Sequence, residues 1–367
     1  GILLSSSVSN FSGGITNSGK ITVTGSGKNA ITDKASTLSG GITNTGMIST
    51  TNDGIHIDTV KSVSGNISNS GTITAPHAVL FFERVTNFTG NIVNSGSIIG
   101  ATNGAIDVQT VSMFAGSIIN SAGGVISAGS STAVRVHNVS TFTGGITNGG
   151  TISSGSKAIS VNGASSFGGG ITNTGTISGS TGIVVANVST FLGAIVNSGT
   201  IIATGGTAID LSAAPNAMTV NITGGAISGN IIGNGTANGD TVNFSPDGTF
   251  VYSNTISGMQ TVAVNSGTLF DSGAITAGTV NVNSGGTLAP GTPGTAGTIL
   301  RITGSLAFAS GALYLDTISA TTASKTTVTG SATLGGAGVQ VASGSTVTAG
   351  HQYLSLIHIS EPTRQAE

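Results

Sequence analysis

The sequence predicts an all-β fold, a parallel β-helix in which the chain winds as a single solenoid with about 24–28 residues per coil. The phrase Phe-x-Gly-Gly-Ile-x-Asn-x-Gly-x-Ile recurs eight times at this period, which is typical of solenoid proteins. Apolar residues alternate with polar ones around it, and glycine and asparagine separate the apolar pieces. Each repeat buries its apolar side chains only by stacking on a neighbour, so a rod with a long lateral surface is expected. The isoleucine that opens the core of the phrase recurs at Ile15, Ile42, Ile67, Ile92, Ile118, Ile146, Ile171 and Ile195.

Three short strands are expected in each coil. The first carries a mostly aromatic column, the second begins at the isoleucine of the phrase, and the third alternates as in Ile106-Asp107-Val108. Alternation with period two puts one side of a strand in the core, so the middle residues of the third strand, such as His56 and Arg135, should face water. The column of the first strand comprises Phe11, Leu38, Val63, Phe88, Phe114, Phe142, Phe167 and Phe191.

One asparagine occupies the same position in every repeat, close to a glycine that follows two residues later in most of them. Asparagine tolerates left-handed backbone angles, and stacked amides can hydrogen-bond along a column. We therefore expect a structural asparagine ladder rather than a catalytic row. Its members are Asn17, Asn44, Asn69, Asn94, Asn120, Asn148, Asn173 and Asn197.

Length variation is confined to one corner of the coil, between the second isoleucine of the phrase and the next Ala-Ile pair. The interval runs from Ile73 to Ala78 in one repeat, whereas the longer one from Ile21 to Ala30 occurs in another. Such a variable corner indicates an exposed turn along one edge of the solenoid, where repeat proteins often carry recognition residues.

Composition excludes several classes of partner and cofactor site. The net charge is -2 and the ten lysines and arginines are scattered, so no basic stripe for nucleic acid is present. The longest apolar run, residues 78–82, is far shorter than the roughly 18 residues of a membrane span. The absence of cysteine excludes disulfides and thiolate metal sites, and no cofactor is expected. A mean hydropathy of +0.34 with regularly spaced isoleucine, valine and phenylalanine favours a folded chain.

The regular repeats are assigned to residues 1–211, and a less regular β-helical part to residues 212–354. Residues 280–291 read VNVNSGGTLAPG, residues 299–306 read ILRITGSL and residues 327–336 read TVTGSATLGG. Together these stretches resemble the end of the passenger domain of bacterial autotransporters, the proteins of type V secretion, over about residues 229–353. The resemblance implies a right-handed β-helix, export through the outer membrane to the cell surface or medium, and autochaperone-like C-terminal coils. It also implies that an outer-membrane β-barrel translocator follows in the full-length chain.

The two ends of the sequence do not read as natural boundaries. Residues 355–367 contain no glycine, break the periodicity and resemble a translated sequencing adapter, so we exclude them from fold reasoning. The first residues, Gly1-Ile2-Leu3-Leu4, align with Gly182-Ile183-Val184-Val185 inside a repeat, so the chain is interpreted as a fragment.

Candidate catalytic pairs are too far apart in the predicted helix. Glycoside hydrolysis needs two carboxyl groups about 5 to 9.5 Å apart. At a coil spacing of about 4.8 Å, Asp107 and Asp210 should lie roughly 19 Å apart, and Asp58 and Asp107 near 12 Å. The stretch from Phe270 to Gly273 carries the letters that surround a serine-protease nucleophile but has no evident histidine and aspartate partners. The sequence therefore predicts a chain without catalysis.

Metal sites are not expected either. The histidines His56, His77 and His137 fall in three different columns, with no carboxylate or second histidine at ligand spacing. The stretch Asn238-Gly239-Asp240 has a weak likeness to calcium-binding nonapeptide repeats, but a single copy cannot supply six to eight oxygen ligands.

One repeat departs from the others at its third strand. Aligned on the apolar pattern, residues 79–85 contain one extra residue, which would turn Leu80 and Phe82 outward beside Glu83 and Arg84. Exposed apolar side chains rimmed by charge mark contact surfaces. The hypothesis is that these four residues contact a ligand on a host or neighbouring cell, either a protein or a glycan.

The function expected from the sequence is that of a secreted or surface-displayed, adhesin-like passenger fragment that binds rather than catalyses, with self-association as a further possibility. The alternative is a carbohydrate-active β-helix enzyme, a polysaccharide lyase or glycosidase, with its site in a loop or in a missing N-terminal part. A carboxylate pair within reach across adjacent coils would favour the enzyme.

Overall fold

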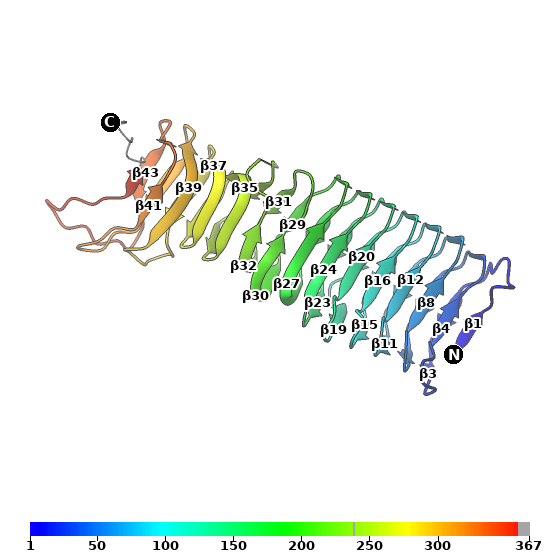
Figure 1. Cartoon of the computed structure of the whole chain (residues 1–367). Coiled ribbons are helices and arrows are strands. Elements are labelled where there is room, and N and C mark those ends of the chain that lie inside the picture. Colours follow the sequence, from blue (N-terminus) through cyan, green and yellow to red (C-terminus); the bar gives the residue numbers. More distant parts are fainter. Residues whose placement is uncertain (238, 359–367) are drawn as a thin grey trace, which may run out of the picture. The chain divides into compact units, whose positions relative to one another are not determined.

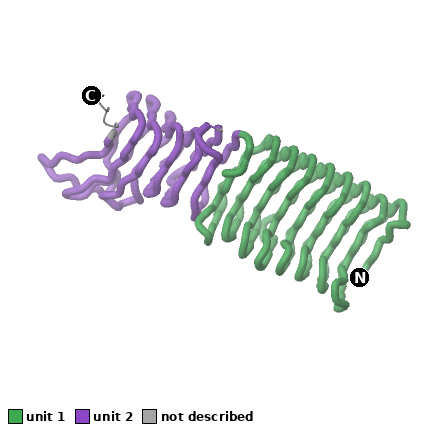
Figure 2. Tube along the Cα trace, in the orientation of Figure 1, with its two compact units in different colours: residues 1–216 green, residues 217–367 purple. Residues whose placement is uncertain are grey.

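The computed structural model describes residues 1–237 and 239–358, and the chain divides into two compact units, residues 1–216 and 217–367 (Figure 1; Figure 2). In each unit, strands of successive coils pair in parallel and in register, which confirms the prediction of an all-β parallel β-helix. No helix occurs in the described ranges, and accordingly none is long and apolar enough to cross a membrane. The division falls after Asn216, whereas the sequence prediction placed it after residue 211.

Most coils of the first unit have four short strands rather than the three that we expected. The Asn-x-Gly step of the phrase bends the chain, so the second predicted strand separates into two, for example β10 (Ile67–Asn69) and β11 (Thr72–Ala75). The first strands, with the aromatic column, are β5 (Thr37–Leu38), β9 (Ser62–Val63), β13 (Asn87–Phe88), β17 (Met113–Phe114), β21 (Thr141–Phe142), β25 (Ser166–Phe167) and β28 (Thr190–Phe191). The second strands are β2 (Ile15–Asn17), β6 (Ile42–Asn44), β10, β14 (Ile92–Asn94), β18 (Ile118–Asn120), β22 (Ile146–Asn148), β26 (Ile171–Asn173) and β29 (Ile195–Asn197).

The third and fourth strands form two further columns of the same unit. The third strands are β3 (Lys20–Thr22), β7 (Met47–Ser49), β11, β15 (Ser97–Gly100), β19 (Val125–Ala128) and β23 (Thr151–Ser154). The fourth strands are β1 (Ile2–Leu4), β4 (Ile31–Asp33), β8 (Ile55–Asp58), β12 (Leu80–Glu83), β16 (Ile106–Gln109), β20 (Val134–His137) and β24 (Lys157–Asn162). In the last coils the two columns merge into the long strands β27 (Thr176–Ala186) and β30 (Thr200–Asp210).

The core lies inside the coils and consists of files of identical side chains. Ile67 pairs with Ile42 on one side and with Ile92 on the other, as the repeat predicts. The phenylalanines of the first strands stack with ring centroids 4.5 to 5.2 Å apart from Phe88 to Phe191. Because each ring buries its faces against the rings above and below, the file is stabilised by burial and by aromatic stacking together.

The asparagine ladder is present and buried. The side-chain Nδ2 of each member lies 2.7 to 2.9 Å from the Oδ1 of the member in the next coil, from Asn17 through to Asn197. Both the isoleucine and the asparagine of each second strand point into the coil, so without the ladder the side-chain oxygen of each buried amide from Asn44 onward would lose the hydrogen bond that it accepts from the preceding member. The ladder therefore serves as a structural element, since unpaired buried amides cost about 1–3 kcal/mol each.

The second unit repeats the parallel architecture with less regular coils. Two of its strand columns are continuous across the coils, one running β31-β33-β35-β37-β39 and the other β34-β36-β38-β40-β43. Its strands are β31 (Thr219–Ile222), β32 (Ala226–Ile232), β33 (Thr241–Phe244), β34 (Thr249–Tyr252), β35 (Thr255–Val264), β36 (Gly267–Asp271), β37 (Ala274–Val282), β38 (Gly286–Pro290), β39 (Ile299–Phe308), β40 (Leu313–Asp316), β41 (Lys325–Val328), β42 (Ala332–Thr333), β43 (Gly338–Val341) and β44 (Leu356–His358).

The tail that resembles an adapter lies partly within the described structure. The backbone of β44 pairs in parallel with β41, and the Tyr314 hydroxyl donates to the Ser355 carbonyl oxygen at 2.7 Å. Residues 359–367 of the same tail lie outside the described residues.

A left-handed corner follows the fourth strand in several coils and supports a stability prediction. Thr110 has a φ of 53° there, where Asn138 and Asn187 of other coils have 51°. A β-branched residue is strained in this conformation, whereas asparagine tolerates it. We expect Thr110→Asn to raise the free energy of unfolding by about 0.5–1 kcal/mol, measured by urea denaturation. Thr132→Asn, at a corner position without a positive φ, should give no such gain, and equal effects of the two substitutions would contradict the strain argument.

Candidate functional site

An ion-paired group of charged residues lies on one outer face of the first unit, formed by the fourth strands β4, β8, β12, β16 and β20; its members are Lys34, Asp58, Glu83, Arg84, Asp107 and Arg135. We call this surface the polar face. Register places two files of outward side chains along it. The first file comprises Thr32, His56, Phe81, Asp107 and Arg135. The second comprises Lys34, Asp58, Glu83, Gln109 and His137.

Asp58 is the centre of an ion-pair network on this face. Its carboxylate lies 2.9 Å from Lys34 Nζ and 2.6 Å from an Arg84 terminal nitrogen, and Arg84 also lies 2.6 Å from Glu83. Burial alone would raise the pKa of Asp58, but hydrogen bonds from Thr59, Lys34 and Arg84 outweigh it and lower the pKa to about 2. Asp58 is therefore a fixed anion that holds two cations.

Asp107 and Arg135 form a second, two-pronged ion pair one step along the face. Arg135 Nε donates to Asp107 Oδ1 at 2.9 Å, and an Arg135 terminal nitrogen donates to Asp107 Oδ2. The Asp107 side chain is 2% exposed while that of Arg135 is 37% exposed, so the guanidinium covers the carboxylate. The outward direction that the alternation predicted for Asp107 is correct, yet the residue is buried because its neighbour lies over it.

The polar contacts of two histidines define their protonation. His137 Nε2 lies 2.8 Å from Gln109 Oε1, an acceptor, so this nitrogen carries the proton. His56 Nδ1 lies 3.0 Å from Asn29 Nδ2, a donor, so the proton of the neutral His56 ring is on Nε2. Burial lowers the pKa of both histidines. Both rings are therefore neutral at physiological pH.

His56 also supports the outward-facing, half-buried aromatic ring of the face, Phe81. Its ring stacks on Phe81 with centroids 4.7 Å apart and planes 26° apart. Because Asn29 Nδ2 donates to His56 Nδ1 at 3.0 Å, the His56 ring is held on its other edge, and this supports the position of Phe81.

A groove of about 330 Å³ runs beside Phe81 where the polar face meets the variable corner. Residues from four successive coils converge on it, because the corner and the fourth strand are adjacent in every coil. Phe81 provides the apolar aromatic ring of the described lining, and the polar lining includes Asp53, His77, Asn103, Asp107 and Arg135. Burial raises the pKa of Asp53, and the nearby His56 partly offsets this shift.

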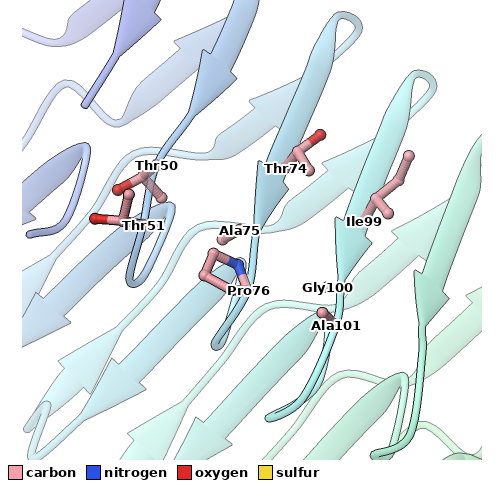
Figure 3. Close-up of a pocket in the computed structure, with 8 residues that line it drawn as sticks. All are labelled: Thr50, Thr51, Thr74, Ala75, Pro76, Ile99, Gly100 and Ala101. Carbon is pink, nitrogen blue, oxygen red and sulfur yellow. The ribbon is translucent and has the colours of Figure 1, made fainter. Parts of the chain in front are cut away.

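A second hollow, of about 410 Å³, lies on the other side of the same corner (Figure 3). Thr50 and Thr51 come from one coil, Pro76 from the next, and Ile99 and Ala101 from the third. Its lining is mostly apolar and carries no charged group among the described residues, so it offers packing surface without directed polar contacts.

The outward placement predicted for Leu80 and Phe82 is wrong. Both side chains are 1% exposed, because Leu80 pairs with Ile55 and Phe82 with Ile57, in the core files. The strand contains no extra residue, since Glu83 pairs with Asp58 and continues the register without a shift. The outward aromatic is Phe81, and aligning Val85 with the valine that follows the corner in other coils would have identified it. Glu83 and Arg84 lie at the surface as predicted, in the ion-pair network.

The prediction that no carboxylate lies at ligand spacing from a histidine is also wrong. Possible ligand atoms of His56, Asp58 and Glu83 lie within 4.8 Å of one another. Lys34 and Arg84 already neutralise Asp58, however, so a cation would have to displace them. The arrangement favours an ion-pair network over a metal centre.

Two other sequence motifs have structural roles in the second unit. Asp240 accepts hydrogen bonds from the backbone N–H groups of Met218 and Asn234 at 2.8 and 2.7 Å, while Asn238 of the calcium-like phrase lies outside the described residues. Asp271 of the protease-like phrase is fully buried at the end of β36, and its Oδ1 accepts from the Gly273 N–H at 2.7 Å. Both carboxyl groups hold backbone turns.

A scan against protein-family models finds no match to the chain, and neither the curated proteins nor the solved structures include one that matches it. Function must therefore be argued from the polar face and from the sequence resemblance.

Proposed function

We propose that the chain is a fragment of an adhesin-like passenger, secreted or displayed on a bacterial surface after export through the outer membrane, that binds a ligand without catalysing a reaction. The resemblance of residues 229–353 to autotransporter passengers supports the export route. The stacked architecture supports binding along a lateral surface, because solenoids offer extended faces for recognition.

One observation supports the location of the binding site. Only 6% of the residues are charged, yet two carboxylates, a guanidinium and a half-buried, outward-facing aromatic ring converge on one groove of the polar face. A concave site with a few directed polar groups around an apolar anchor is the usual form of a ligand site. We therefore assign ligand contact to this groove rather than to Leu80 and Phe82, which lie in the core.

The state of Asp107 favours binding over catalysis. Both of its carboxylate oxygens accept hydrogen bonds from the Arg135 guanidinium, so this carboxylate is already engaged by a protein donor. Such a pair instead presents the remaining N–H groups of Arg135 in a fixed orientation, which suits recognition.

The binding proposal predicts that adhesion depends on Phe81. Beads coated with the purified chain should attach to cultured epithelial cells or to bacterial cells more than uncoated beads do, since multivalent display strengthens weak contacts. Phe81→Ser should reduce attachment at least tenfold. Ile99→Ser, which removes an exposed apolar side chain from the other hollow, is the matched control and should leave it unchanged. Attachment that does not exceed the uncoated beads, or that survives Phe81→Ser in full, would refute the proposal.

A carbohydrate-active enzyme is the second candidate, and one observation favours it. Asp53 and Asp107 line the same groove, a pair that spacing along the sequence did not select, and burial raises the pKa of Asp53 in the manner of a general acid. Incubation with a panel of polysaccharides, followed by assays for new reducing ends and for unsaturated uronic acids, distinguishes the two. Product release that Asp53→Asn abolishes would establish the enzyme in place of the adhesin.

A further inference from the structure

We propose that the groove beside Phe81 binds an uncharged glycan segment of one or two sugar rings. This inference rests on the proposed binding function and names the class of its ligand. Three properties of the groove support it: a supported aromatic ring, polar groups that can hydrogen-bond a ligand, and the sign of the charge.

The aromatic ring provides an apolar platform for the C–H face of a sugar. Phe81 points outward from β12, and its stacking on His56 at 4.7 Å prevents it from folding onto the face. Because the ring is already immobilised, a ligand that packs on it loses little side-chain entropy from the protein. Aromatic rings pack well against flat apolar surfaces whose rims carry polar groups.

The polar groups match the hydrogen-bonding capacity of hydroxyls, which both donate and accept. Arg135 uses two of its nitrogens on Asp107, and its side chain is 37% exposed, so further N–H donors face the groove. The side chains of His77 and Asn103 are exposed and make no hydrogen bond to other described residues, which leaves their polar atoms for a ligand. Asp53 offers carboxylate oxygens as acceptors.

The charge of the groove selects against acidic ligands. Two carboxylates, Asp53 and Asp107, line the groove with one guanidinium, which leaves an excess of one negative charge. Lys34 and Arg84 balance Asp58 and Glu83 on the same face. A uronic acid, a sialic acid or a phosphate would meet this excess of negative charge, whereas an uncharged sugar does not. The volume of about 330 Å³ lies near the lower limit for small-ligand pockets, which suits one or two rings rather than a protein surface.

The test is titration of the full chain by calorimetry with uncharged oligosaccharides built from hexoses and N-acetylhexosamines, and with oligosaccharides that contain uronic acids. We expect an uncharged oligosaccharide to bind with a Kd of about 0.1–1 mM, as a small groove allows, and the acidic ones at least tenfold more weakly. Phe81→Ser should weaken binding more than tenfold and Asn103→Ala about threefold to tenfold. Phe81→Tyr should retain binding, and Ile99→Ser should not alter it. Circular dichroism of each variant confirms that it is folded.

Three results would overturn the inference: preference for the acidic oligosaccharides, equal binding by Phe81→Ser, or no binding of any oligosaccharide. The last result can be separated from failure of the proposed function. If coated beads still attach to cells in a Phe81-dependent manner while no oligosaccharide binds, the chain is an adhesin whose ligand is a protein. If the beads do not attach and no oligosaccharide binds, both proposals fail.

Discussion

Replacing Gly96 by alanine is expected to reduce the free energy of unfolding of the first unit by more than about 3 kcal/mol. A Cβ at this position would lie 2.1 Å from the Gly71 carbonyl oxygen of the preceding coil and 2.6 Å from the Ser70 carbonyl carbon. Neither atom can move alone, because Gly71 O accepts the Ser97 N–H at 2.8 Å in the stacked sheet. The two coils would have to separate, which weakens the core files and the asparagine ladder together.

The chain contains a matched control for this substitution. Gly19 occupies the same position of the phrase in the first repeat, and a Cβ there would meet nothing within 4 Å. Neither glycine has a positive φ, so conformational strain does not differ between the two sites. We expect Gly19→Ala to change stability by less than about 0.5 kcal/mol in urea denaturation. Similar losses in the two variants would show that close stacking does not explain the glycine of the phrase.

The second unit is expected to lose stability as the pH rises from about 4 to about 7. Asp271 is fully buried in β36, where burial raises its pKa to about 7, partly offset by the hydrogen bond from Gly273. Its Oδ2 accepts no hydrogen bond from the described residues, so the ionised form would be poorly compensated. The adjacent Tyr252, which pairs with Asp271 in the sheet, is likewise buried.

The direction of this pH dependence follows from proton linkage. The folded pKa of Asp271 lies above its unfolded value of 3.8, so the protonated carboxyl stabilises the fold fully below about pH 4. As the pH rises, the unfolded chain releases this proton first, and the stabilisation is lost by the time the pH passes the folded pKa near 7. Because each pKa unit corresponds to 1.36 kcal/mol, the free energy of unfolding should fall by about 4 kcal/mol over this pH range. Burial also raises the pKa of Asp316, which acts in the same direction.

Hydrogen exchange of the full chain provides the measurement, read at the amides of β34, β36 and β38. Protection there should fall between pH 4 and pH 7 after correction for intrinsic exchange, and Asp271→Asn should remove most of the dependence. The exposed Asp247→Asn in the same unit is the control and should retain it. A flat profile in the unmodified chain would show that the Asp271 carboxyl is not buried as described.

The repeating parts of the fold could be predicted from sequence because one spacing repeats eight times. The isoleucine files, the phenylalanine stack and the asparagine ladder each need only a constant column, and a column is visible without knowledge of the turns. The number of strands per coil was missed, since the bend at Asn-x-Gly divides a segment whose apolar pattern looks continuous. Leu80 and Phe82 were misplaced for a related reason, because a run of apolar residues at 78–82 hides which positions alternate inward.

The groove beside Phe81 could not be predicted from columns of equivalent positions in the repeats. Asp53 and Asn103 belong to the variable corner, whose length differs between coils, so they share no column with Phe81 or Asp107. Sequence spacing compares equivalent positions of different coils, whereas the groove joins unlike positions of neighbouring coils. For the same reason the proximity of His56 to Asp58 and Glu83 escaped notice, although all three lie on adjacent fourth strands.

The amide column in the core has an orientation. Each Nδ2 also donates to backbone oxygens, as Asn94 does to Gly96 and Val125 at 3.1 Å each, which determines the end of the side chain that faces onward. All seven links consequently point the same way, and their dipoles add head to tail, with each bond polarising the next by roughly 10–30%. A coil inserted in the reverse sense would set nitrogen against nitrogen or oxygen against oxygen. The core of the first unit therefore has a direction along the solenoid axis. The amide column favours correctly oriented coils over inverted ones without any contribution from surface residues.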